Sequence, residues 1–136
     1  MKTTNLLLVT LAASFAAVTG ARAQTATLPP ASTHAGVTYA TDLKPIFDTS
    51  CVKCHSGDKA KARLHLDTLA GVLKGTKMGP ILKAGDSANS FVTKAVAHLT
   101  KDRDAWMPPL KNKAGIKPLT PEQISLIRAW IDQGAK

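Results

Sequence analysis

The sequence predicts an all-α fold with one small domain. In four segments apolar residues recur at intervals of three and four, which is the period of an amphipathic helix. No segment alternates apolar and polar residues as a strand would, and the stretches between the predicted helices are rich in Gly, Pro and Lys. With 136 residues, the chain has the length of one domain rather than two.

The first 23 residues have the three parts of a secretory signal peptide. Lys2 gives a positive start, residues 6–18 form an apolar run, and Ala21-Arg22-Ala23 supplies the small-x-small pattern at which signal peptidase cleaves. The apolar run is shorter than the roughly 20 residues that a membrane-spanning helix needs. We therefore expect residues 1–23 to be removed, and the mature protein to be periplasmic or otherwise exported, with no membrane span.

Residues 24–38 are rich in Ala, Thr and Pro and lack an apolar period, so we expect a flexible leader there. The folded domain is expected over 39–136. Its predicted helices span 41–51, 68–74, 88–99 and 120–134.

The boundaries of these helices follow from capping residues. For the second helix, Asp67 is the expected cap and Gly75 the expected stop. Asp86 or Ser87 is expected to cap the third helix. The fourth begins with Thr120-Pro121-Glu122-Gln123, a capping box with proline at the first helical position, and it is the clearest of the four.

The chain is strongly basic. Its formal net charge of +9 falls to +7 once Lys2 and Arg22 leave with the signal peptide. A basic surface attracts acidic partners and speeds the encounter with them. Nucleic acid is not an expected partner, because the protein is predicted to be exported and does not interleave aromatic with basic residues.

The most informative motif is Cys51-Val52-Lys53-Cys54-His55, a C-x-x-C-H sequence that is typical of covalent haem attachment. Two thiols three positions apart can form thioethers with the two vinyl groups of one haem. His55 then lies beneath the iron as its proximal ligand. Export agrees with this chemistry, because c-type haem is attached outside the cytoplasm. The motif therefore predicts one haem c per chain.

Two other chemistries also use closely spaced cysteines. A thioredoxin-like dithiol contains C-x-x-C, but it requires a βαβ setting that the predicted elements do not provide. A zinc site requires a second pair of ligands, and His65 and His98 are not paired at metal-binding spacing. Haem attachment is favoured over both.

The sixth coordination position of the iron decides between electron transfer and ligand binding or catalysis. Met107 is the favoured distal ligand, because Pro108 and Pro109 stiffen its loop and can hold the thioether at a fixed position. Met78, in a more flexible glycine-flanked setting, is the second candidate. The histidine candidates are His65, His98 and His34.

Other side chains suit the surroundings of a haem, although each also suits an ordinary core or surface position. The apolar wall is expected from Leu64, Leu66, Leu69 and Leu73. Arg63, Arg103 and the Trp106 indole are able to donate to propionates, although a solvated surface position is the favoured interpretation of each Arg.

Taken in order along the chain, these motifs resemble the planctomycete-type cytochrome c domain, a class I c-type cytochrome. Beside the attachment motif, the resemblance is carried by Ile46-Phe47, Leu64-His65-Leu66-Asp67-Thr68, Gly85-Asp86-Ser87-Ala88-Asn89-Ser90, Met107-Pro108-Pro109 and Leu119-Thr120 before a helix that contains Ile127-Arg128-Ala129-Trp130-Ile131. It covers about residues 39–136. It implies a helical domain wrapped around one covalent haem, with thioethers at Cys51 and Cys54 and iron ligation by His55 and Met107.

The expected function is that of a single-electron carrier rather than an enzyme, with redox proteins, acidic ones among them, as partners. Two alternatives remain open from the sequence. One is a five-coordinate haem enzyme or gas sensor, although peroxidases built on c-type haem commonly need two haems and only one C-x-x-C-H is present. The other is a redox subunit that works within a larger complex.

Overall fold

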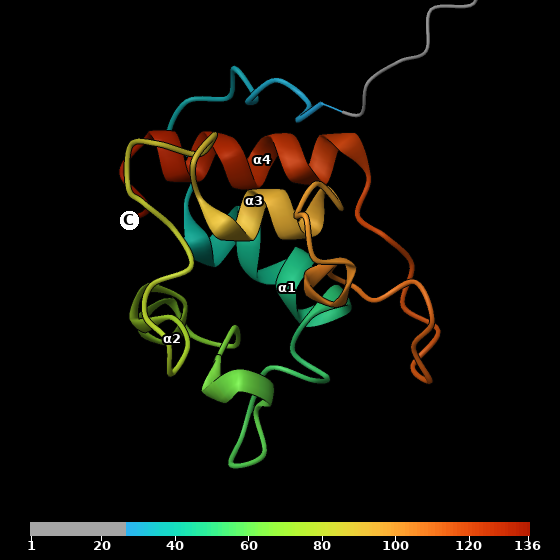
Figure 1. Ribbon diagram of the computed structural model, residues 1–136. Coiled ribbons are helices and arrows are strands. Elements are labelled where there is room, and N and C mark those ends of the chain that lie inside the picture. The colour runs from blue at the N-terminus through green and yellow to red at the C-terminus, as the bar shows by residue number, and fades with distance from the viewer. Residues whose placement is uncertain (1–26) are drawn as a thin grey trace, which may run out of the picture.

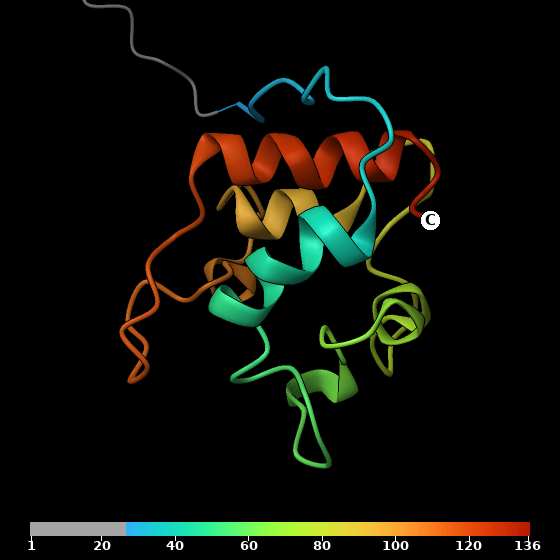
Figure 2. The same cartoon turned by 180° about the vertical axis from the view of Figure 1, so that it is seen from behind.

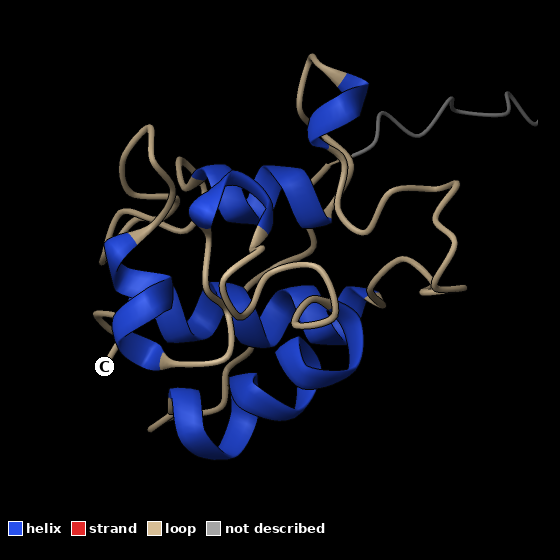
Figure 3. Cartoon of the chain, turned by 90° about the horizontal axis from the view of Figure 1, so that it is seen from below, coloured by secondary structure: helices blue, strands red, loops and turns tan. Residues whose placement is uncertain are grey.

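The structure, a computed structural model, describes residues 27–136 (Figure 1). The predicted signal peptide lies outside the described residues. Within them the regular elements are helices, and the nearest approach to a strand is an isolated bridge between Thr76 and Gly79 (Figure 3). The predicted all-α fold class is confirmed.

The helices are short, and loops connect them. A π-helical turn, η1, leads directly into α1, and two 3-10 turns, η2 and η3, lie in the later loops. In chain order the elements are η1 (Tyr39–Leu43), α1 (Lys44–Ser50), η2 (Lys61–Arg63), α2 (Leu69–Lys74), α3 (Phe91–Val96), η3 (Arg103–Ala105) and α4 (Pro121–Asp132).

The core lies where η1, α1 and α3 meet α4. Helix α4 runs along one side of the molecule with α3 beside it, whereas α2 and the loop after α1 lie further from α4 (Figures 1 and 2). The Tyr39 ring packs at a tilt against Phe47 and Trp130, with centroids 6.1 and 6.4 Å away. The most deeply buried large side chains are Leu43, Phe47, Ile127, Trp130 and Ile131. Each stabilises the fold by roughly 1.5–3 kcal/mol through removal of apolar surface from water.

The predicted fourth helix is confirmed together with its cap. The Thr120 hydroxyl accepts from the Gln123 amide, and the Gln123 side chain accepts from the Thr120 amide, so the capping box is complete. The second helix also agrees with prediction, and Gly75 ends it with a φ of 76°. Its cap is Thr68 rather than Asp67, because the Thr68 hydroxyl accepts from the amide of Gly71.

The third helix is shorter than predicted at both ends. Neither Asp86 nor Ser87 caps it, because the Asp86 side chain closes a turn onto Asn89 and the helix begins only at Phe91. It ends at Val96, two residues before His98 adopts a left-handed backbone with a φ of 58°.

Residues 27–38 lie along α4 (Figures 1 and 2). The Ser32 amide donates to the Ser125 carbonyl at 3.0 Å, and the Gln133 side chain bonds both the Val37 amide and the His34 carbonyl. The segment expected as a leader therefore makes specific contacts with the last helix. The start of the domain at residue 39 stays a prediction.

A partly buried polar network connects the loop before α3 to α4. Ser87 is 1% exposed, and its amide and hydroxyl donate to the two carboxylate oxygens of Asp132 at 2.7 and 2.8 Å. Arg128 donates to the same hydroxyl at 3.0 Å, and Thr93 donates to the Ser87 carbonyl at 2.5 Å. The network fixes the position of α3 on α4.

We predict that Asp132→Ala lowers the free energy of unfolding by about 2 kcal/mol, because the buried Ser87 amide and hydroxyl lose their acceptor. Urea denaturation measures the change. Asp48→Ala is the matched control, since it removes an exposed ion pair with Lys44 and should cost less than about 1 kcal/mol. Equal losses in the two variants would contradict the role assigned to the network.

Candidate functional site

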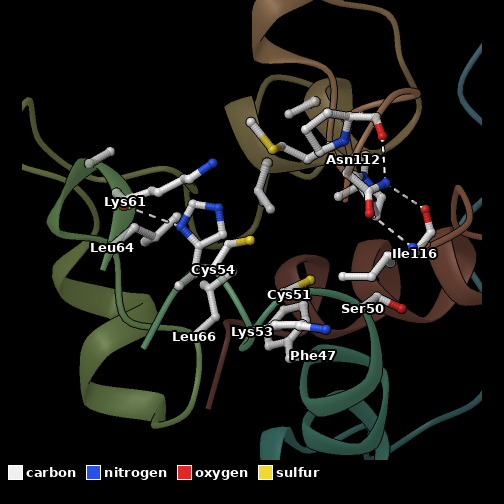
Figure 4. Close-up of a pocket in the computed structure, with 18 of the residues that line it drawn as sticks. Phe47, Ser50, Cys51, Lys53, Cys54, Lys61, Leu64, Leu66, Asn112 and Ile116 are labelled. Atoms are coloured by element: carbon white, nitrogen blue, oxygen red, sulfur yellow. Dashed lines mark hydrogen bonds between the residues drawn. The ribbon is translucent and has the colours of Figure 1, made fainter. Parts of the chain in front are cut away.

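A largely apolar cavity of about 670 Å³ lies among α1, α3 and the loops on either side of them (Figure 4). Its apolar lining includes Phe47, Leu64, Leu66, Ile81, Val92 and Ile116. The volume falls within the range of small-molecule and cofactor sites, roughly 300–1,000 Å³.

The attachment motif lies where α1 ends. Cys51 follows the last helical residue, and its carbonyl accepts from the amides of both Cys54 and His55, at 3.1 and 3.0 Å. This tight turn places two thiols and one imidazole at the same cavity, because Cys51, Cys54 and His55 all line the cavity. The sulfur atoms of Cys51 and Cys54 are separate free thiols (Figure 4).

The His55 ring is oriented by the loop that follows it. Its Nδ1 lies 3.2 Å from the carbonyl oxygen of Lys61, which can only accept, so the neutral tautomer with hydrogen on Nδ1 satisfies the contact. That tautomer leaves the Nε2 lone pair free to bind a metal. The loop is held in turn, because the Leu66 amide donates to the His55 carbonyl at 2.8 Å.

Burial sets the protonation states of the His55 imidazole and the Cys51 thiol. Desolvation lowers the pKa of His55, opposed in part by the hydrogen bond to Lys61. Burial, with a smaller contribution from Cys54, raises the pKa of the Cys51 thiol to about 12. Cys51 is therefore a neutral thiol at pH 7, unlike the low-pKa thiolate of a disulfide oxidoreductase.

Met107 lines the cavity and lies two residues after the end of η3. Its amide donates to the Ala95 carbonyl of α3 at 3.0 Å, so its backbone is tied to a wall of the site. Met78 is 88% exposed and does not line the cavity. Of the five distal candidates, Met107 alone lines the cavity; those outside it are Met78, His34, His65 and His98.

Only some of the residues expected to surround a haem line the cavity. Leu64 and Leu66 line the cavity, whereas Leu69 and Leu73 do not. The Trp106 indole also lies outside the cavity lining and donates to the Thr100 carbonyl at 3.2 Å. Its role as a propionate donor stays a prediction. Arg103 lies over the Trp106 ring, 4.5 Å from its centroid.

Sequence reasoning missed Asn112, which organises the loop that closes one side of the cavity (Figure 4). Its side-chain amide donates to the carbonyls of Pro109 and Ile116, both at 2.8 Å, and its oxygen accepts from the Ile116 amide at 2.9 Å. An isolated Asn in a loop of Pro and Lys gives no sequence signal for this role.

The charged side chains in the cavity lining are all positive. Four lysines belong to it, and no Asp or Glu does: the four are Lys53, Lys61, Lys111 and Lys113. Lysines at the edge of an apolar cavity create a positive potential, which attracts anionic groups and acidic proteins.

Residues 27–136 contain no cluster of three or more His, Cys, Asp or Glu side chains able to hold a metal ion. In the same part of the chain no helix combines the length and apolarity that crossing a membrane requires.

The helical fold and a cavity lined by C-x-x-C-H and a methionine are similar to those of a small c-type cytochrome domain. Residues 51–111 match the family described as Planctomycete cytochrome C, which confirms the resemblance predicted from the sequence. The matched segment contains Cys51, Cys54, His55 and Met107. The match indicates covalent haem and haem-based electron transfer. Comparisons with curated proteins and with solved structures found no match.

We predict that Asn112→Ala loosens the loop around it, because the Ile116 amide and two carbonyls lose their partner. Hydrogen exchange should show faster exchange at Ile116, and the unfolding free energy should fall by about 1 kcal/mol. Asn89→Ala, which breaks an exposed turn contact with Asp86 instead, is the control. Unchanged protection of Ile116 in Asn112→Ala would contradict this role.

Proposed function

We propose that this chain is a single-electron carrier that holds one haem c. In this proposal Cys51 and Cys54 form the thioethers, His55 is the proximal ligand and Met107 is the distal ligand. The observation that carries the proposal is that all four side chains line one apolar cavity.

The residues present fit a covalent haem. Two free thiols and an imidazole with a free Nε2 lie together at one edge of the cavity, and a soft thioether belongs to the same lining. When bound, haem supplies an iron that gains and loses one electron. The apolar walls exclude water, which keeps the environment of both ligands constant.

The protein's own contribution is a fixed geometry. The Lys61 carbonyl holds the His55 ring, and the Ala95 carbonyl holds the backbone of Met107. Ligands held by the backbone move little between two charge states, so little reorganisation accompanies electron transfer. A thioether ligand also raises the reduction potential compared with a second imidazole.

The partner in this proposal is an acidic redox protein in an exported compartment. Four lysines and no acidic side chain in the cavity lining favour an encounter with a negative surface. Cytochrome c domains are typically exported, and the predicted signal peptide over residues 1–23 agrees with export.

We predict that Met107→Ala opens the iron in the haem-loaded protein. The weak far-red band of methionine-ligated ferric haem should disappear, the potential should fall, and the ferrous form should bind carbon monoxide rapidly. Visible absorption, potentiometry and stopped-flow mixing measure these changes. Met78→Ala is the matched control and should change none of them, because Met78 is exposed away from the cavity.

An unchanged far-red band in Met107→Ala would rule out Met107 as the ligand. Rapid carbon monoxide binding to the wild-type ferrous protein would favour the five-coordinate enzyme or sensor instead. Absence of covalent haem after expression with the c-type maturation machinery would overturn the proposal as a whole.

We predict that replacing Lys111 and Lys113 by Glu slows oxidation of the ferrous protein by ferricyanide about tenfold at low ionic strength, because the field that attracts an anion is reversed. The same variant should react faster with cationic hexaammineruthenium(III), and added salt should reduce both effects. The control replaces the exposed Lys74 and Lys101, which match the change in net charge but do not line the cavity. Equal rates in the two double variants would contradict a local docking field.

A further inference from the structure

The Met107 loop carries an arrangement of side chains that the proposed function does not use. The His98 ring stacks on the Trp106 ring with centroids 4.9 Å apart and an interplanar angle of 5°. The Arg103 guanidinium lies 4.5 Å from the centroid of the same indole. These three side chains, His98, Trp106 and Arg103, are called here the loop stack.

The loop stack is hydrogen-bonded on both sides of Met107. His98 Nε2 lies 3.1 Å from the Pro108 carbonyl, which can only accept, so the ring N–H donates to it. On the other side, the Trp106 indole donates to the Thr100 carbonyl at 3.2 Å. Met107 is therefore flanked by two residues that are held in place, and its own amide is bonded to Ala95.

The backbone at His98 connects this arrangement to α3. The Leu99 amide donates to the Lys94 carbonyl and the His98 amide to the Ala95 carbonyl, which is the Schellman pattern of a helix end. His98 occupies the left-handed position of that pattern, where glycine is normally favoured. A side chain at this unfavourable position is fixed relative to the last turn of α3.

We infer that His98 is a positioning residue that holds Met107 at the iron through Pro108 and Trp106. The inference rests on the proposed function, in which Met107 is the distal ligand. His98 does not line the cavity, so it acts on the ligand through its two neighbours rather than by contact with haem. Because α3 also lines the cavity, the loop stack ties the distal ligand to a wall of the site.

The test compares haem-loaded His98→Gly with the wild-type protein. Glycine removes the ring and suits the left-handed backbone, so the thermal unfolding midpoint should change little. The expected result is a weaker far-red band and a rise of about fivefold in the rate of carbon monoxide binding to the ferrous form, the size expected for losing one hydrogen bond. A purely structural role would lower the midpoint and leave the band and the rate unchanged.

Ala135→Gly is the matched control. Ala135 also has a left-handed backbone, with a φ of 56°, and it does not line the cavity. It should leave the far-red band and the carbon monoxide rate at their wild-type values. A change as large as that in His98→Gly would mean that relief of backbone strain anywhere in the fold opens the iron, and would overturn the inference.

Met107→Ala, measured alongside, separates the two hypotheses. If it opens the iron and His98→Gly does not, the inference about His98 fails and the carrier proposal stands. If Met107→Ala has no effect, the proposed ligand fails and the inference fails with it. Should His98→Gly not fold, Trp106→Leu tests the same stack from its other side, and an unchanged carbon monoxide rate in that variant would overturn the inference.

Discussion

Helix α3 lies between the core and the cavity, and its packing against α4 is the contact on which both depend. A helix of six residues is not stable by itself, so it exists because tertiary contacts hold it. The Ser87–Asp132 network and the buried side chains of Val92 and Val96 supply those contacts. The same helix also provides the Ala95 carbonyl for the Met107 amide. Movement of α3 on α4 would therefore disturb the core and the position of Met107 together.

One physical effect, desolvation, explains the state of the groups that line the cavity. Taking an ionisable group out of water disfavours its charged form, so burial lowers the pKa of His55 and raises that of Cys51. Both groups are thus neutral near pH 7. Charge is confined to lysines, which keep their ammonium groups near water while their stems line apolar surface. A neutral interior with a positive edge suits a buried redox centre that meets acidic partners.

The sequence predicted the elements whose signals are local. The capping box at Thr120 and the glycine stop at Gly75 involve only near neighbours, and both are confirmed. The early start predicted for α3 was wrong, because the Asp86 side chain accepts a hydrogen bond within a turn instead of capping the helix. Residue propensity does not distinguish an aspartate that closes a turn from one that caps a helix. Asn112 was missed for a related reason: its bonds go to carbonyls whose position depends on the folded loop.

The Met107 loop is understood only when the sequence and the tertiary contacts are considered together. The two prolines that follow Met107 indicate a stiff loop. Stiffness alone does not determine the position of the loop relative to the rest of the fold. The structure supplies the missing contacts, with the Met107 amide bonded to α3 and the loop stack beside it. An iron whose sixth position must open for a substrate gains nothing from such anchoring, because each contact adds to the free energy needed to release the ligand. A centre that only exchanges electrons benefits from it, because a ligand that stays in place keeps reorganisation small. With Met107 as the proposed distal ligand, this arrangement favours the proposed carrier over the five-coordinate enzyme on physical grounds.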